Sequence, residues 1–120
     1  MEVVLKRVYD GCSSDDGLRI FVDRLWPRGL SKSSLPYDIL AKEVAPSPQL
    51  RRFYHLNPQE HWEQFSIGYA EELKDSVALK QLVEEIRKLS PERVTLLYAF
   101  KSRVQNHALV LKQAIEDLIK

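Results

Sequence analysis

One segment near the carboxyl end of the chain constrains the fold more than any other. Arg93 to Lys101 reads RVTLLYAFK and carries apolar residues on both faces of a strand, whereas a strand with one solvated face alternates apolar and polar residues. The pattern predicts a central strand over Val94 to Phe100, covered on both sides.

Two further strands are predicted in the first quarter of the chain. Glu2 to Val8 is rich in β-branched residues, and Leu18 to Leu25 alternates apolar and polar residues at its start, as strands do. Tyr37 to Val44 fits a strand or a helix, and Pro36 favours the strand.

Four helices are predicted from their start signals. Ser47, Asn57 and Asn106 each stand where a helix N-cap is expected, and a further helix is expected to begin near Ser76. The helices are expected over residues 48–55, 58–75, 76–89 and from 107 onward. The second should bury an apolar stripe at helical spacing, which consists of Trp62, Phe65, Tyr69 and Leu73.

Strands on both sides of a helical block predict an α/β fold, a three-layer sandwich with a small, mainly parallel sheet and helices on both faces. The 120 residues suit a single domain, 1–120. The link from Val8 to Leu18 is too short for an ordinary helical crossover, so the first two strands could also form an antiparallel hairpin.

Composition narrows the classes of partner. The net charge of +1 gives no strong electrostatic attraction for nucleic acid or anionic membrane, and no apolar run has the length of a membrane span. The single Cys12 fits a reducing compartment, so a cytoplasmic location is expected. A nucleic-acid-binding or regulatory module remains an alternative if Arg19, Arg24, Arg28, Lys32, Arg51 and Arg52 gather on one face, and a protein–protein interaction module is a second.

The densest polar cluster follows the second predicted strand. Asp23, Arg24, Trp26 and Arg28 stand there, and ligands of α/β sheets bind at the carboxyl ends of strands. The arginines could clamp a phosphate or carboxylate, Trp26 could stack on a ring, and Asp23 could orient an arginine or act as a base. The alternative is a buried ion pair of Asp23 and Arg24 beneath a core tryptophan.

A second cluster follows the central strand. It contains Lys101, Asn106 and His107; the helix start offers amides to an anion and His107 could serve as acid or base. A solvated lysine, a cap and a packed histidine are the structural alternative. If the two strands are parallel neighbours, both clusters share one positively charged cleft, and Tyr9 and Asp10 after the first strand could form a third wall.

Metal and cofactor sites are not expected. His55 and His61 are six positions apart, which does not match the i, i+4 spacing of a helical metal pair. The glycines form no phosphate-binding loop, and the acidic neighbours of Cys12 disfavour a thiolate.

Several longer motifs resemble one known family. They are VYDG at residues 8–11, DRLWPRGLSK at 23–32, KEVAPS at 42–47, LRRFYH at 50–55, LLYAFK at 96–101 and NHA at 106–108. Together they resemble the YeaO-like family, known as domain of unknown function 488, over nearly the whole chain.

The resemblance implies a parallel first strand pair with a shortened crossover, and it supplies no established activity. A sister branch has a cysteine-and-histidine motif after its last strand, and Tyr98 stands where that branch has its cysteine. Covalent thiol chemistry is therefore not expected. We expect a small ligand that bears a phosphate or carboxylate, bound at the carboxyl edge of the sheet, with or without catalysis.

Overall fold

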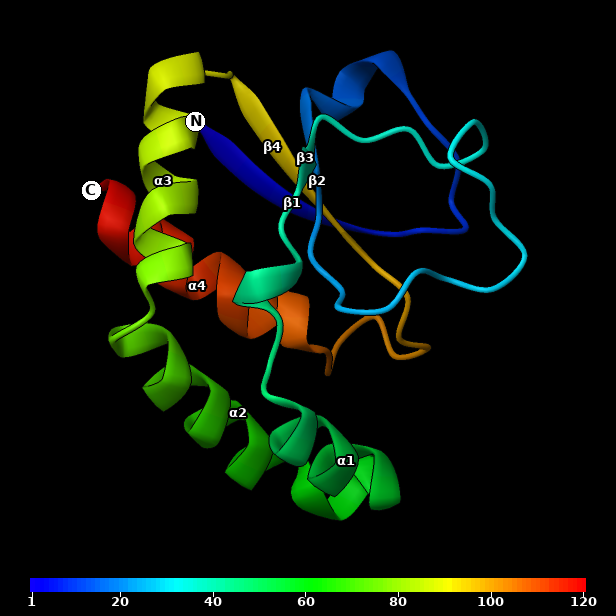
Figure 1. The fold of residues 1–120 in the computed structure, drawn as a ribbon, viewed down its shortest axis with the longest axis vertical. Helices are drawn as coiled ribbons and strands as arrows, with labels where there is room; N and C mark the ends of the chain where they lie inside the picture. Colours follow the sequence, from blue (N-terminus) through cyan, green and yellow to red (C-terminus); the bar gives the residue numbers. More distant parts are fainter.

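The computed structural model describes residues 1–120 and contains one four-stranded parallel sheet (Figure 1). The strand order is β1-β4-β2-β3. The strands are β1 (Glu2–Arg7), β2 (Leu18–Phe21), β3 (Ile39–Leu40) and β4 (Arg93–Tyr98). The α/β class and the parallel sheet are confirmed, and the hairpin alternative for the first two strands is wrong because β4 lies between them.

The strands end earlier than the sequence pattern predicts. β2 ends at Phe21 instead of Leu25, and β4 ends at Tyr98 instead of Phe100. The amide of Val22 still donates to the carbonyl of Leu97 at 3.1 Å. The chain then leaves the sheet, and Pro27, which cannot donate to a strand ladder, lies in the loop that follows.

Four α-helices begin near the predicted caps. They are α1 (Pro48–Leu56), α2 (Pro58–Lys74), α3 (Val77–Leu89) and α4 (His107–Ile119). The side chains of Ser47, Asn57, Ser76 and Asn106 each accept a hydrogen bond from the third backbone amide that follows, which satisfies a donor that the first helical turn leaves free.

The first face of the sheet carries the main core. Ile20, Val94 and Leu96 point to this face and are completely buried against the helices. α4 packs directly on β1 and β4, and α2 and α3 pack on α4 (Figure 1). Of the stripe predicted on α2, Phe65, Tyr69 and Leu73 are buried, and Trp62 is half-buried against the same core.

The second face of the sheet is covered by loops and one turn of 3-10 helix, η1 (Ser14–Asp16), where we expected helices. Phe21 and Leu97 point to this face and pack with Leu35 from the loop after β2. The connection from β1 to β2 is too short to hold a helix and two loops. The loop of residues 22–38 contains Pro27, Gly29 and Pro36, which oppose helix formation.

The ambiguous segment from Tyr37 to Val44 divides into two elements. Ile39 and Leu40 form β3 at the edge of the sheet, and a single 3-10 turn, η2 (Lys42–Val44), follows. No helix of the structure combines the length and the apolar character needed to cross a membrane.

Candidate functional site

Asp23 and His107 meet at the carboxyl edge of the sheet. Asp23 follows β2, and His107 is the first residue of α4. The imidazole Nε2 of His107 lies 3.0 Å from Asp23 Oδ1 and 3.1 Å from the carbonyl oxygen of Val22. The other carboxylate oxygen of Asp23 accepts a hydrogen bond of 2.9 Å from the amide of Ala99. The sequence clusters after β2 and β4 therefore converge at this pair.

The neighbours of His107 fix which ring nitrogen carries a proton. Both groups beside Nε2 are oxygen acceptors, so Nε2 must hold a hydrogen. This leaves Nδ1 without a partner in the protein. Asp23 thus orients the ring, and Nδ1 is the nitrogen that could exchange a proton or meet a ligand.

Arg24 is a half-buried cation without a counter-ion. Its Nη2 lies 3.4 Å from the carbonyl oxygens of Ala45 and Pro46, at the long limit of a hydrogen bond. Its Nε is buried and has no acceptor. Arg24 forms no ion pair with any carboxylate of the chain. The ion pair of Asp23 and Arg24, which was the structural alternative to a ligand site, does not form, because Asp23 faces His107.

The first two turns of α1 bring further positive charge to this edge. Burial lowers the pKa of His55, the neighbouring Arg51 and His107 lower it further, and Asp23 opposes them. The ring of His55 lies 5.2 Å from that of Phe100. Arg51 was singled out only for a nucleic-acid surface and His55 only for a metal pair. Their i, i+4 spacing, which places both on one helix face, is the signal that could have linked them to this edge.

Tyr69 supports the same corner from α2. Its hydroxyl donates to the carbonyl of Val44, and its ring lies 6.1 Å from that of His107. Complete burial raises the pKa of Tyr69 well above its usual value, and the charges of Glu72 and Asp23 raise it further. The hydroxyl therefore stays protonated and acts as a fixed donor.

Asn106 and Lys101 differ in their environment. Asn106 is fully buried; its Oδ1 accepts from the amide of Leu109 at 3.0 Å and its Nδ2 donates to the carbonyl of Ser102 at 3.1 Å. These bonds use the side-chain amide of Asn106 as a helix cap, which was the structural alternative to a role in ligand binding. Lys101 is exposed and forms no hydrogen bond or ion pair, so its charge is free to face an approaching anion.

Trp26 and Arg28 belong to the loop over the second face. Trp26 packs 5.2 Å from the ring of Phe21, and its Nε1 donates to the carbonyl of Leu30 at 2.6 Å. The side chain of Arg28 is exposed, and its carbonyl accepts a hydrogen bond of 3.0 Å from the hydroxyl of Tyr9. No hydrogen bond or ion pair joins these residues to the pair of Asp23 and His107.

Asp10 is held by arginines. Arg103 makes two hydrogen bonds of 2.8 Å to its carboxylate. Arg7 donates from its amide to Asp10 and from its guanidinium to the carbonyls of Ala99 and Phe100. The hydrogen bond from Arg103 is the main cause that lowers the pKa of Asp10 to about 2. This network fastens β1 to the segment after β4 and leaves Asp10 no free oxygen for a ligand cation.

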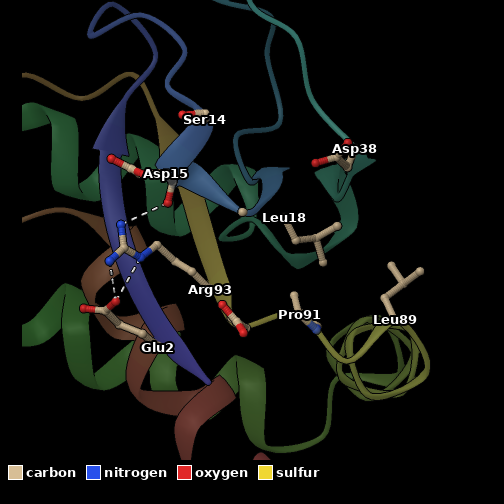
Figure 2. A pocket seen from close by; sticks show the side chains of 10 residues that line it. Glu2, Ser14, Asp15, Leu18, Asp38, Leu89, Pro91 and Arg93 are labelled. Carbon is tan, nitrogen blue, oxygen red and sulfur yellow. Dashed lines mark hydrogen bonds and ion pairs between the residues drawn. The ribbon is translucent and has the colours of Figure 1, made fainter.

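A cavity of about 990 Å³ lies at the opposite, amino edge of the sheet (Figure 2). Figure 2 shows Arg93 reaching between Glu2 and Asp15, with Leu89 and Pro91 on another wall. Asp38 and Glu92 add two more carboxylates to the lining. Negative charge therefore dominates this cavity, which disfavours the anionic ligand expected from the sequence. No group of three or more potential ligand side chains is arranged to hold a metal ion.

Comparisons with known proteins place the chain in one family. The family model described as the inactive DUF488-N3 subclade matches residues 2–120. The uncharacterized protein YeaO of Escherichia coli is 41% identical over 98% of this chain and 100% of its own length. The uncharacterized protein Rv3073c of Mycobacterium tuberculosis is 42% identical over 94% of this chain and 92% of its own. No solved structure matches. The chain therefore belongs to the YeaO-like family, within the group described as the inactive DUF488-N3 subclade.

Proposed function

We propose that this protein binds a small molecule bearing a phosphate or carboxylate at the carboxyl edge of its sheet, as a binding protein and not as an enzyme. The observation that carries the proposal is Arg24, whose half-buried guanidinium has no carboxylate partner and whose Nε has no acceptor. A buried polar group left without a partner costs about 1–3 kcal/mol. An anion bound beside Arg24 would offset that cost.

The surrounding charges support an anion at this edge. Arg51 and His107 both lie close enough to His55 to lower its pKa, and Asp23 is the carboxylate that opposes them. The amino end of α4 begins at His107 and adds the positive end of a helix dipole. Asp23 is turned toward His107 and the amide of Ala99, so it positions the imidazole without opposing the ligand directly.

The chemistry available at this edge favours binding over turnover. His107 Nδ1 is a single proton-exchanging group, and both oxygens of Asp23 are engaged or buried. The family description reads "inactive". Both observations support a site that holds its ligand unchanged.

Isothermal titration with inorganic phosphate, glycerol phosphate and citrate tests the proposal. Arg24→Gln is expected to weaken binding of the best ligand roughly 10- to 100-fold, which corresponds to about 1.5–3 kcal/mol for a charged hydrogen bond. Because Arg24 has no ion-pair partner to lose and its buried Nε has no acceptor, its replacement should not lower the free energy of unfolding.

The matched control is Arg52→Gln on α1, an exposed arginine outside the cluster, which should leave affinity unchanged. Arg28→Ala tests the second arginine of the clamp expected from the sequence; a loss of affinity equal to that of Arg24→Gln would extend the site to the loop of residues 22–38. A wild-type protein that binds none of the three anions at millimolar concentration, or a destabilised Arg24→Gln variant with unchanged affinity, would refute the proposal.

A further inference from the structure

β1 and β3 are the two edge strands of the sheet. A small groove lies beside β3, between this strand, η2 and α3. Its volume is about 220 Å³. Six of the nine residues that line it are apolar: Ile39, Leu40, Ala41, Val44, Ala78 and Leu82. Neither Asp23 nor His107 lines this groove.

β3 leaves one side of the sheet open. In the order β1-β4-β2-β3, β3 pairs with β2 on one side and with no strand on the other. The side chain of Leu40 on this strand is 40% exposed. An open strand edge presents unpaired backbone groups that can accept an added strand, and peptide-binding domains combine this pairing with a pocket for alternate side chains.

The charges at the groove indicate the kind of partner. Glu43 and Glu85 line it, no cation does, and neither carboxylate forms an ion pair. A basic partner would complement these carboxylates. A second copy of this chain, paired edge to edge through β3, would bring the same carboxylates toward one another, which is unfavourable.

We propose that the open edge of β3 and the adjacent groove bind an extended segment of a partner protein with the pattern basic-x-apolar-x-basic. In an extended strand, residues two positions apart point to the same face. The central apolar side chain would enter the groove, and the two basic side chains would reach Glu43 and Glu85. Backbone pairing with β3, which has only two residues, would align the segment, and the groove and the two carboxylates would supply affinity and specificity.

Fluorescence polarisation with a labelled peptide of central sequence Arg-Thr-Ile-Thr-Arg tests this proposal. Saturable binding to the wild-type protein is expected, together with at least tenfold weaker binding of the peptides Glu-Thr-Ile-Thr-Glu and Arg-Thr-Asp-Thr-Arg. Glu85→Lys should weaken the basic peptide at least tenfold. Glu84→Lys is the matched control, because Glu84 is an exposed neighbour on α3 that does not line the groove, and it should retain most of the affinity.

Gln81→Trp provides a second variant, since a bulky ring at this lining position should fill the groove and block the isoleucine. Equal binding of the basic and acidic peptides, or equal effects of Glu85→Lys and Glu84→Lys, would overturn the proposal. So would the absence of saturable binding. A dimer in sedimentation experiments that Glu85→Lys disrupts and the peptide does not displace would assign the edge to a second copy instead. None of these outcomes depends on anion binding at the carboxyl edge.

Discussion

Replacing Asp16 by alanine is expected to lower the free energy of unfolding by about 3–5 kcal/mol, the usual cost of removing one partner from a buried ion pair. Asp16 is only 6% exposed and lies over the second face of the sheet. Its carboxylate pairs with the buried guanidinium of Arg19 and with Lys6 at 3.0 Å, and it accepts from the amide of Ser13 at 3.0 Å. Alanine would leave the Arg19 charge buried and unpaired.

Urea denaturation measures this loss, and Asp15→Ala is the control. The Asp15 side chain next to it is exposed and forms no ion pair, so its removal should cost less than about 0.5 kcal/mol. A double-mutant cycle with Arg19→Met identifies the mechanism: this change should destabilise the wild-type protein but stabilise the Asp16→Ala variant. A loss below about 1 kcal/mol for Asp16→Ala would contradict the assignment.

The Asp16 carboxylate also makes the free energy of unfolding depend on pH. Burial alone would raise the pKa of Asp16, but the bonds from Ser13, Lys6 and Arg19 outweigh it and lower the pKa below the usual 3.8. A carboxyl group with a lowered folded-state pKa contributes stability above its unfolded pKa and loses it as the pH falls through the folded value. Wild-type stability should therefore fall below about pH 4 more steeply than that of Asp16→Ala, as followed by urea titrations from pH 6 downward.

The first face of the sheet could be predicted from the sequence because its signals are local and strong. Apolar residues on both faces of Arg93 to Lys101 identified the central strand. The helix start signals in the sequence predicted the first residues of the four helices to within a residue or so. The parallel arrangement of β2 and β4 then brought the segments after them to one edge. The contact of Asp23 with His107 follows from that topology.

The second face could not be predicted because its cover has no periodic pattern. Trp26 sits in a polar motif, yet it packs over Phe21 and bonds back to the carbonyl of Leu30. Asp16 stands in a turn-rich stretch and gives no sign that it anchors buried cations on two strands. Its partner Arg19 occupies a strand position that alternation assigns to a polar face. The sequence does not show whether these charged residues, although they are only three and ten positions apart, turn toward each other in the interior.

The candidate site was partly predictable for the same reason. Residue type alone does not separate a ligand-binding side chain from one used by the fold. The side-chain oxygens of Asn106 and Asp10 accept hydrogen bonds within the protein, whereas the Nε of Arg24 finds no acceptor. A side chain used by the fold is distinguished from one free to bind a ligand by its hydrogen-bond partners, and only the three-dimensional structure shows these partners.

Gly17→Ala is expected to be the other strongly destabilising change, with a loss of about 3–5 kcal/mol from backbone strain and steric overlap together. Gly17 precedes β2 and has φ +64°, a conformation that residues with a Cβ rarely adopt. A Cβ at this position would lie 2.3 Å from the carbonyl oxygen and 3.0 Å from the carbonyl carbon of Arg93. Both are backbone atoms at the start of the central strand, so neither can move aside without shifting β4.

Gly11→Ala separates the two causes. Gly11 also has a positive φ, +81°, but a Cβ there would meet nothing within 4 Å, so alanine should cost only about 1 kcal/mol. The difference between the two variants in thermal and urea denaturation measures the steric term alone. Equal losses would mean that the chain before β2 moves away from β4 at little cost. In that case the close approach of Gly17 to Arg93 would not be what allows the parallel strands β1 and β2, on either side of β4, to be joined by so few residues.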